Sequence, residues 1–207
     1  MKKIALLLLL AFPKMQAQDT IYYPKVDDFR RMYFELGIVQ PQGNLANKFD
    51  KATRLGVWFR NKIKRNQFID IGLEVDLLVK PRQVGYNFHD SIIKLESAKS
   101  GLKIGLRYSR IFPLSKKDPN FNLETNTGLG WSSLYYSVPD HYKQELIDRL
   151  DKKTNLHTVF LSQTLKFNLY DFGVFCTYSY TPHTLFTHHY EADFGSQSVA
   201  VGLVYRF

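Results

Sequence analysis

Residues 68–79 read FIDIGLEVDLLV, and this stretch decides the fold. Apolar residues alternate along it with acidic or small ones: Ile69, Ile71, Leu73, Val75 and Leu77 against Asp70, Gly72, Glu74 and Asp76. Side chains of a β-strand point to opposite faces in turn, so an alternation with a period of two predicts a strand with one apolar and one polar face. Such a strand is not buried on both sides.

The same alternation recurs in seven further segments, which are residues 34–38, 54–60, 102–109, 123–131, 159–167, 172–180 and 197–207. The connections between the eight segments alternate in length. Residues 42–53, 80–100, 133–155 and 182–196 form long loops, whereas residues 61–66, 113–119 and 168–171 form short turns that carry Asn or Asp. An even number of strands with turns on one side and long loops on the other predicts an all-β, eight-stranded antiparallel up-and-down transmembrane barrel.

The charges on the polar faces change sign from each strand to the next. In chain order they are Glu35, then Arg54 and Arg60, then Asp70, Glu74 and Asp76, then Lys103 and Arg107, then Glu124, then Lys166. The short turn at residues 61–66 permits a register with Arg60 opposite Asp70 and Arg54 opposite Asp76. Opposite charges on adjacent strands stabilise each other. We therefore expect these side chains to form a paired network in the barrel lumen.

The alternative is a soluble barrel such as a lipocalin, with an apolar lumen that holds a small ligand. Eight columns of large apolar residues would crowd so narrow a barrel, and the charges would then lie outside. The aromatic residues favour the membrane barrel, because they fall into two groups near the strand ends. Those near the short turns are Tyr33, Phe112, Phe121, Tyr170, Phe172, Tyr205 and Phe207, and those near the long loops are Trp131, Tyr135, Tyr136, Phe160, Tyr178 and Tyr180. The alternation of apolar and polar residues along the strands has exceptions. Gln163 and Cys176 fall on the apolar face, and Phe160 and Phe175 fall on the polar one.

The composition agrees with a folded barrel. The chain has 207 residues, of which 44% are hydrophobic and 23% charged, so it is neither disordered nor a coiled coil. Residues 1–17 have the basic start, nine-residue apolar stretch and small-residue exit of a secretory signal peptide, and that stretch is too short to span a bilayer. Residues 18–30 are then a short periplasmic lead and residues 31–207 the barrel. The net charge of +9 would suit nucleic acid, but secretion to the cell outer membrane argues against that partner.

Three segments resemble a known family. A signal ending Met15-Gln16-Ala17-Gln18, the strand YFELGIV at residues 33–39 and the final VAVGLVYRF at residues 199–207 are similar to the small outer-membrane β-barrel proteins of Bacteroidota, with OmpX-like and PorT-like barrel domains. The resemblance implies that Leu203, Tyr205 and Phe207 belong to the C-terminal signal that the outer-membrane assembly machinery reads. PorT-like barrels are associated with type IX secretion, which makes a secretion complex one expected setting.

Several functions fit such a barrel. The interior of an eight-stranded barrel is filled by its own side chains, so a narrow pore is the least favoured of these functions. A lipid-A-modifying enzyme would need a nucleophile and a base near the outer rim. The candidates are His157 with Ser162, and a loop-four group of His183, His188, His189, Glu191 and Asp193. Loop-four histidines could also bind a metal if the loop folds back, but we expect neither a metal nor another cofactor.

An interaction role fits the third long loop best. Residues 137–153 read SVPDHYKQELIDRLDKK, with a capping arrangement at the start, and predict a short helix in extracellular loop three. Its apolar face would consist of Tyr142, Leu146, Ile147 and Leu150. This face either covers the barrel mouth together with Leu45 and Phe49, or docks a partner.

Loop two is mildly basic, which suits lipopolysaccharide phosphates; its charged residues are Lys80, Arg82, Lys94 and Lys99 against Asp90 and Glu96. The expected partners are thus membrane lipids including lipopolysaccharide, the assembly machinery and other envelope proteins. The sequence therefore predicts a non-enzymatic outer-membrane barrel that is a structural or accessory subunit of a cell-envelope complex, with surface ligand binding as an alternative.

Overall fold

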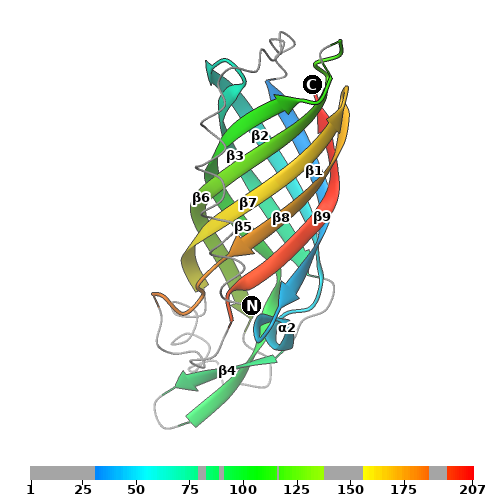
Figure 1. Ribbon diagram of the computed structural model, residues 1–207. Coiled ribbons are helices and arrows are strands. Elements are labelled where there is room, and N and C mark those ends of the chain that lie inside the picture. Colours follow the sequence, from blue (N-terminus) through cyan, green and yellow to red (C-terminus); the bar gives the residue numbers. More distant parts are fainter. Residues whose placement is uncertain (1–30, 79–82, 89–90, 116, 138–155, 187–194) are drawn as a thin grey trace.

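The chain forms a closed antiparallel β-barrel (Figure 1). The structure, a computed structural model, describes residues 31–78, 83–88, 91–115, 117–137, 156–186 and 195–207. Its elements are β1 (Met32–Gln42), α2 (Leu45–Lys48), β2 (Ala52–Lys64), β3 (Gln67–Leu78), β4 (Gln83–Phe88), β5 (Ser91–Pro113), β6 (Phe121–Ser137), β7 (Leu156–Leu169), β8 (Phe172–Tyr180) and β9 (Gln197–Arg206). Within these ranges we find no helix with the length and apolar character needed to cross a membrane.

Eight of the strands make up the barrel wall. The order of pairing is β3-β2-β1-β9-β8-β7-β6-β5, and β5 pairs with β3 to close the ring. Each strand thus lies next to its neighbours in the sequence, and the first and last strands, β1 and β9, pair with each other. This confirms the predicted eight-stranded antiparallel up-and-down barrel.

The second long loop is not the irregular segment that the sequence suggested. It contains β4 and the first part of β5, which pair as a hairpin beyond the barrel, with Gln83 opposite Glu96 and Phe88 opposite Ser91. β5 therefore runs far beyond the segment 102–109 expected for it. The predicted helix of loop three, with Tyr142, Leu146, Ile147 and Leu150, lies outside the described residues. The helix that the structure does describe, α2, lies in loop one.

The two faces of each strand have opposite character. Outward side chains are mostly apolar and exposed, as in β3, where Leu73 and Ile71 are 43% and 48% exposed. Inward side chains are mostly polar, small or aromatic, with a few aliphatic ones such as Ile111 and Val204. Two of the aromatic residues near the strand ends, Tyr33 and Phe160, point inward and are buried, as the position of Phe160 on the polar face predicted for that residue. The strand alternation of β1 and β7 requires this, because Glu35 and Ser162, two residues further along each strand, also face the interior.

Large rings in the interior lie against inward glycines. The Phe160 ring occupies the space above Gly105 and Gly130, and the Phe175 ring lies over Gly37. A Cβ atom at any of these glycines would come within about 2.8 Å of the ring carbon. This packing explains why Phe160 and Phe175 interrupt the polar face.

The mouth of the barrel at the long-loop end is covered by an apolar cluster. Loop one supplies Leu45 and Phe49, and the hairpin and the top of β7 supply the remainder, which are Val84, Tyr86, Ile93, Leu95 and Leu156. α2 and β4 lie at the same end of the barrel, away from the C-terminus (Figure 1). Leu45 and Phe49 therefore take part in a cover, as the sequence suggested, and the hairpin is its other part. We call this set of seven residues the mouth cluster.

Replacing Gly130 with Ala should destabilise the barrel by about 1–3 kcal/mol, the usual cost of overpacking. The new Cβ would overlap the carbonyl oxygen of Ile104 and lie 2.8 Å from the Phe160 ring. The free energy of unfolding, measured by urea titration in detergent micelles, checks this. Ser132→Ala, two residues further along the same inward face, serves as the control and should change stability less. Equal stabilities would contradict the close packing of Gly130.

Candidate functional site: an ion-pair chain across the barrel interior

The ten charged residues predicted for the lumen all point into the barrel and contact one another. Strand alternation places them there, because each is flanked by two outward residues. The salt bridges join them into one sequence of alternating sign: Asp70, Arg60, Glu124, Lys166, Glu35, Arg107, Glu74, Arg54, Asp76, Lys103. We call this sequence the ion-pair chain. It contains five carboxylates and five cations, so it is neutral as a set.

One end of the ion-pair chain is held by Arg60. Its guanidinium nitrogens Nε and Nη2 donate to the two carboxylate oxygens of Asp70, at 2.8 and 2.9 Å. Nη1 and Nη2 donate to Glu124, at 3.1 and 2.5 Å. Lys166 Nζ continues the chain, at 3.7 Å from Glu124 and 2.7 Å from Glu35. Arg60 thus binds two carboxylates with paired contacts, the geometry to which a planar guanidinium is suited.

The other end is centred on Arg107 and Arg54. Arg107 Nη1 lies 2.7 Å from Glu35 Oε1, and its Nη2 donates to Glu74. Arg54 Nη1 lies 3.2 Å from Glu74, and its Nε and Nη2 donate to Asp76 at 2.7 and 3.0 Å. Lys103 Nζ ends the chain, at 3.1 Å from Asp76 Oδ2.

Some of these contacts join adjacent strands and others cross the lumen. β2 and β3 have the register expected from the sequence, with Arg60 opposite Asp70 and Arg54 opposite Asp76. By contrast, Arg60 reaches Glu124 from β2 to β6, and Glu35 contacts cations of two strands, β5 and β7, with which β1 does not pair. The cross-lumen contacts tie opposite walls of the barrel together.

Uncharged inward residues complete the hydrogen bonding of the carboxylates. The Tyr33 hydroxyl donates to Asp70 Oδ2 at 2.9 Å, and the Ser109 hydroxyl donates to the same oxygen. Asn126 Nδ2 donates to Glu124 at 2.7 Å. Burying a charge is costly unless it is paired and hydrogen-bonded, so these residues are part of the site. No motif in the sequence marks them as site residues, and their place on the polar faces is the only signal that could have found them.

Aromatic rings cover the cations. The Arg107 guanidinium carbon lies 3.6 Å from the centroid of the Trp58 ring, and Lys166 Nζ lies 3.8 Å from that of Tyr33. Cations are attracted to ring faces, more strongly where water is excluded. The interior is thus occupied by paired charges and rings.

A buried histidine lies between the ion-pair chain and the mouth cluster. His183 follows β8, and its ring centroid is 5.9 Å from that of Phe49. Burial, together with the nearby charge of Lys103, lowers the pKa of His183 to about 3. Near neutral pH the imidazole is therefore uncharged.

The structure does not bring the described catalytic candidates together in one site. His157 and Ser162 lie on opposite faces of β7, because His157 is exposed on the outer side and Ser162 is buried in the interior. His188, His189, Glu191 and Asp193 lie outside the described residues. Within the described residues, no group of three or more His, Cys, Asp or Glu side chains has the arrangement of a metal site.

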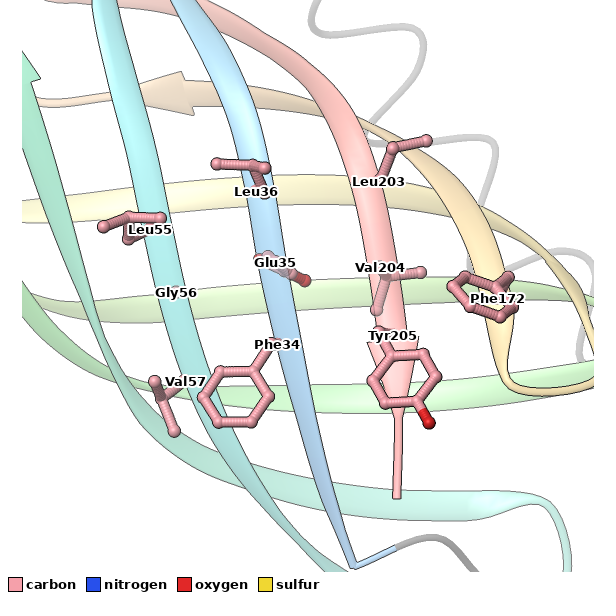
Figure 2. Close-up of a pocket in the computed structure, with 10 residues that line it drawn as sticks. All are labelled: Phe34, Glu35, Leu36, Leu55, Gly56, Val57, Phe172, Leu203, Val204 and Tyr205. Carbon is pink, nitrogen blue, oxygen red and sulfur yellow. The ribbon is translucent and has the colours of Figure 1, made fainter.

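The residues of the expected C-terminal assembly signal lie on the outer face. Leu203, Tyr205 and Phe207 point outward, and Tyr205 and Phe207 form an edge-on ring pair with centroids 4.7 Å apart. Leu203 and Tyr205 also line an apolar groove across β2, β1, β9 and β8, whose outward wall residues include Phe34, Leu36 and Phe172 (Figure 2). The groove is a feature of the outer surface, on the other side of the wall from the Glu35 ion pairs.

No known family model matches the chain, and no curated protein matches it in sequence. One solved structure that is similar is the outer membrane protein Ail of Yersinia pestis, whose backbone structure was determined in a phospholipid bilayer nanodisc. The sequences are 11% identical, the TM-score is 0.44, and the match covers 86% of this chain and 100% of the other.

Replacing Arg107 with Met should destabilise the barrel by about 3–5 kcal/mol, since it leaves two buried carboxylates, Glu35 and Glu74, without their shared cation. The urea midpoint of unfolding in micelles measures the change. Arg110→Met, on the outer face of the same strand, should cost less than about 1 kcal/mol. Similar losses in both variants would contradict the role of Arg107 in joining the two walls.

Acid should loosen the mouth before the barrel wall. The pKa of His183 is about 3 in the fold and about 6.5 when the side chain is exposed to water in an unfolded chain. Below pH 6.5, protonation of His183 therefore favours a state in which the mouth cluster has opened and the imidazole is exposed. The stability of the mouth then falls as the pH is lowered from 7 to 5. Amide hydrogen exchange in α2 and β4, corrected for intrinsic rates, measures this fall. His183→Gln should remove it and His157→Gln should keep it. A pH dependence unchanged by His183→Gln would contradict the assignment.

Proposed function

We propose that this chain is an integral outer-membrane β-barrel, without enzymatic or channel activity, that serves as a structural or accessory subunit of a cell-envelope complex. The observation that carries the proposal is the polarity of the wall. Apolar side chains cover most of the outside on all eight strands, and the ion-pair chain is inside. In water this arrangement would expose a large continuous apolar surface, whereas in a bilayer it satisfies both faces.

The height of the apolar surface supports a membrane setting. On β7 the outward residues from His157 to Phe167 span ten residue steps. With about 3.4 Å per residue and a strand tilt of about 40°, this corresponds to roughly 26 Å, close to the ~25 Å apolar band of outer-membrane barrels. Trp131 stacks on His157 at one end of this band, and Phe121 packs edge-on against Phe167 at the other.

The filled interior argues against a pore. Contacts such as Arg60 with Glu124 and Glu35 with Lys166 cross the lumen, and an eight-stranded barrel has only enough width for its own side chains. The absence of an enzyme activity is part of the proposal, and the opposite facing of His157 and Ser162 supports it.

The folded mouth supports an interaction role. The hairpin of β4 and β5 extends beyond the barrel, and its Ile92 side chain is 73% exposed. An ordered apolar cluster under this hairpin fixes its position on the barrel. A subunit of a larger complex could bind its partner through a hairpin that is fixed in position in this way. The resemblance to barrels of Bacteroidota, some associated with type IX secretion, is the reason to look for that partner among secretion components.

The membrane setting is tested by placing a charge on the outer face. Leu73→Arg, in the middle of β3, should weaken folding into lipid vesicles by about 2–4 kcal/mol. Ile63→Arg, at the β2–β3 turn and similarly exposed, should fold as the wild type does. Equal folding of the two variants would contradict membrane insertion.

The role in a complex is tested by gentle detergent extraction from the native membrane, followed by sizing and mass spectrometry of co-eluting proteins. A stoichiometric partner that is lost in Ile92→Asp and kept in Ile63→Asp is the expected result. Recovery of the wild-type chain without another protein would overturn the subunit role. A steady conductance in planar bilayers would overturn the closed lumen.

A further inference from the structure

A row of polar side chains crosses the mostly apolar outer face. Thr127 Oγ1 on β6 donates to Gln163 Oε1 on β7, at 2.8 Å. The strand register aligns this pair with a tyrosine on each side, since Tyr108 lies opposite Thr127 and Tyr178 lies opposite Gln163. We call these four residues the polar row. They occupy four successive strands, β5 to β8.

The surroundings of Gln163 within the polar row are apolar. Leu129 and Leu161, opposite each other on β6 and β7, are 59% and 58% exposed on the side of the long loops. Leu165 and Cys176, opposite each other on β7 and β8, are exposed on the side of the short turns. On β7 and β8 the polar row thus interrupts the apolar band, whereas on β5 and β6 the next outward pair toward the short turns, Arg110 and Thr125, is polar.

Gln163 lies well inside that band. It is four residues from Phe167 and six from His157 along β7. With about 3.4 Å per residue and a tilt of about 40°, these separations correspond to roughly 10 and 16 Å of height. Water does not reach this depth in a bilayer, so the side chain must find its hydrogen bonds in protein.

The carboxamide of Gln163 has hydrogen-bonding capacity left over. Its Oε1 accepts one bond from Thr127 and has a second lone pair, and its Nε2 carries two N–H donors. Among the described residues, Nε2 has no acceptor. Leaving an amide unsatisfied in hydrocarbon is costly, and polar side chains on the membrane-facing surface of a protein mark contacts with another protein segment.

We infer that two copies of this chain associate in the membrane through the polar row, with their Gln163 side chains paired across a two-fold axis. A carboxamide is its own complement, because the Nε2 of each copy can donate to the free lone pair of the other copy's Oε1. A symmetric dimer repeats such a contact reciprocally with one surface. Leu129 and Leu161 flank Gln163 and provide the apolar packing. This inference rests on the proposed membrane setting.

The part of the outer face centred on β1 and β9 offers a comparison. The groove across β2, β1, β9 and β8 in Figure 2 is lined by outward side chains that are almost all apolar, such as Leu36 and Leu203. Lipid chains satisfy such a surface without a protein partner. Contact between copies should therefore involve the polar row and leave Leu36 in lipid.

Cysteine cross-linking in phosphatidylcholine vesicles at low protein-to-lipid ratio tests this. In a Cys176→Ala background, Leu161→Cys should give a cross-linked dimer at least tenfold more readily than Leu36→Cys. Adding Gln163→Leu to Leu161→Cys should reduce the yield at least tenfold. Since Leu suits the lipid-facing surface, the urea midpoint of this variant should not fall, which separates loss of association from misfolding. Gln163→Asn keeps the carboxamide and should retain part of the yield.

Equal cross-linking at positions 161 and 36, or a yield unchanged by Gln163→Leu, would overturn the dimer. A different protein cross-linked to position 161 in native membranes, with no self-adduct, would also overturn it. The vesicle-folding comparison of Leu73→Arg with Ile63→Arg distinguishes the failures. If those variants differ as expected and the cross-linking fails, the dimer alone is wrong. If they fold equally, the membrane setting is wrong as well.

Discussion

The contact of Arg107 with Glu35 and Glu74 is the interaction on which the interior depends. It joins β1, β3 and β5, and it links the half of the ion-pair chain that contains Arg60 with the half that contains Arg54. A buried carboxylate is stable only when a cation and hydrogen-bond donors satisfy it. Because the ten charges alternate in sign along one chain of contacts, removing any inner member leaves two neighbours short of a partner. The ten buried charges are therefore stable in the barrel interior only when all of them are present.

The small width of the barrel lumen is the second constraint, and it accounts for the mixture of large and small residues on the inner face. Where the rings of Phe160 and Phe175 lie along the inner wall, the one or two strands beside them have glycine beneath the ring: Gly130 and Gly105 for Phe160, and Gly37 for Phe175. The same closeness brings Trp58 to within 3.6 Å of the Arg107 guanidinium carbon. Packing and electrostatics are thus satisfied by the same contacts, and a filled lumen agrees with a role other than transport.

Function is then expected at surfaces and not in the interior. The mouth, with its hairpin and apolar cluster, and the polar row on the outer face are two such surfaces, and they differ in setting. The mouth would meet partners in water, whereas the polar row would meet them in lipid, where a hydrogen bond has no competition from solvent. A barrel that pairs with a second copy through Gln163 would present two mouths side by side to a partner complex.

Local alternation in the sequence determined the number of strands, their faces and their register at short turns. The residues on each face follow from a period of two, and a short turn leaves little freedom in register, which is why Arg60 opposite Asp70 was predictable. The alternation of apolar and polar residues does not indicate which inward side chains lie close to each other across the lumen. The contacts of Arg60 with Glu124 and of Glu35 with Lys166 arise only when the sheet closes on itself and brings non-adjacent strands face to face. Tertiary packing on the mouth cluster, not local pattern, likewise makes a β-hairpin of part of the second long loop.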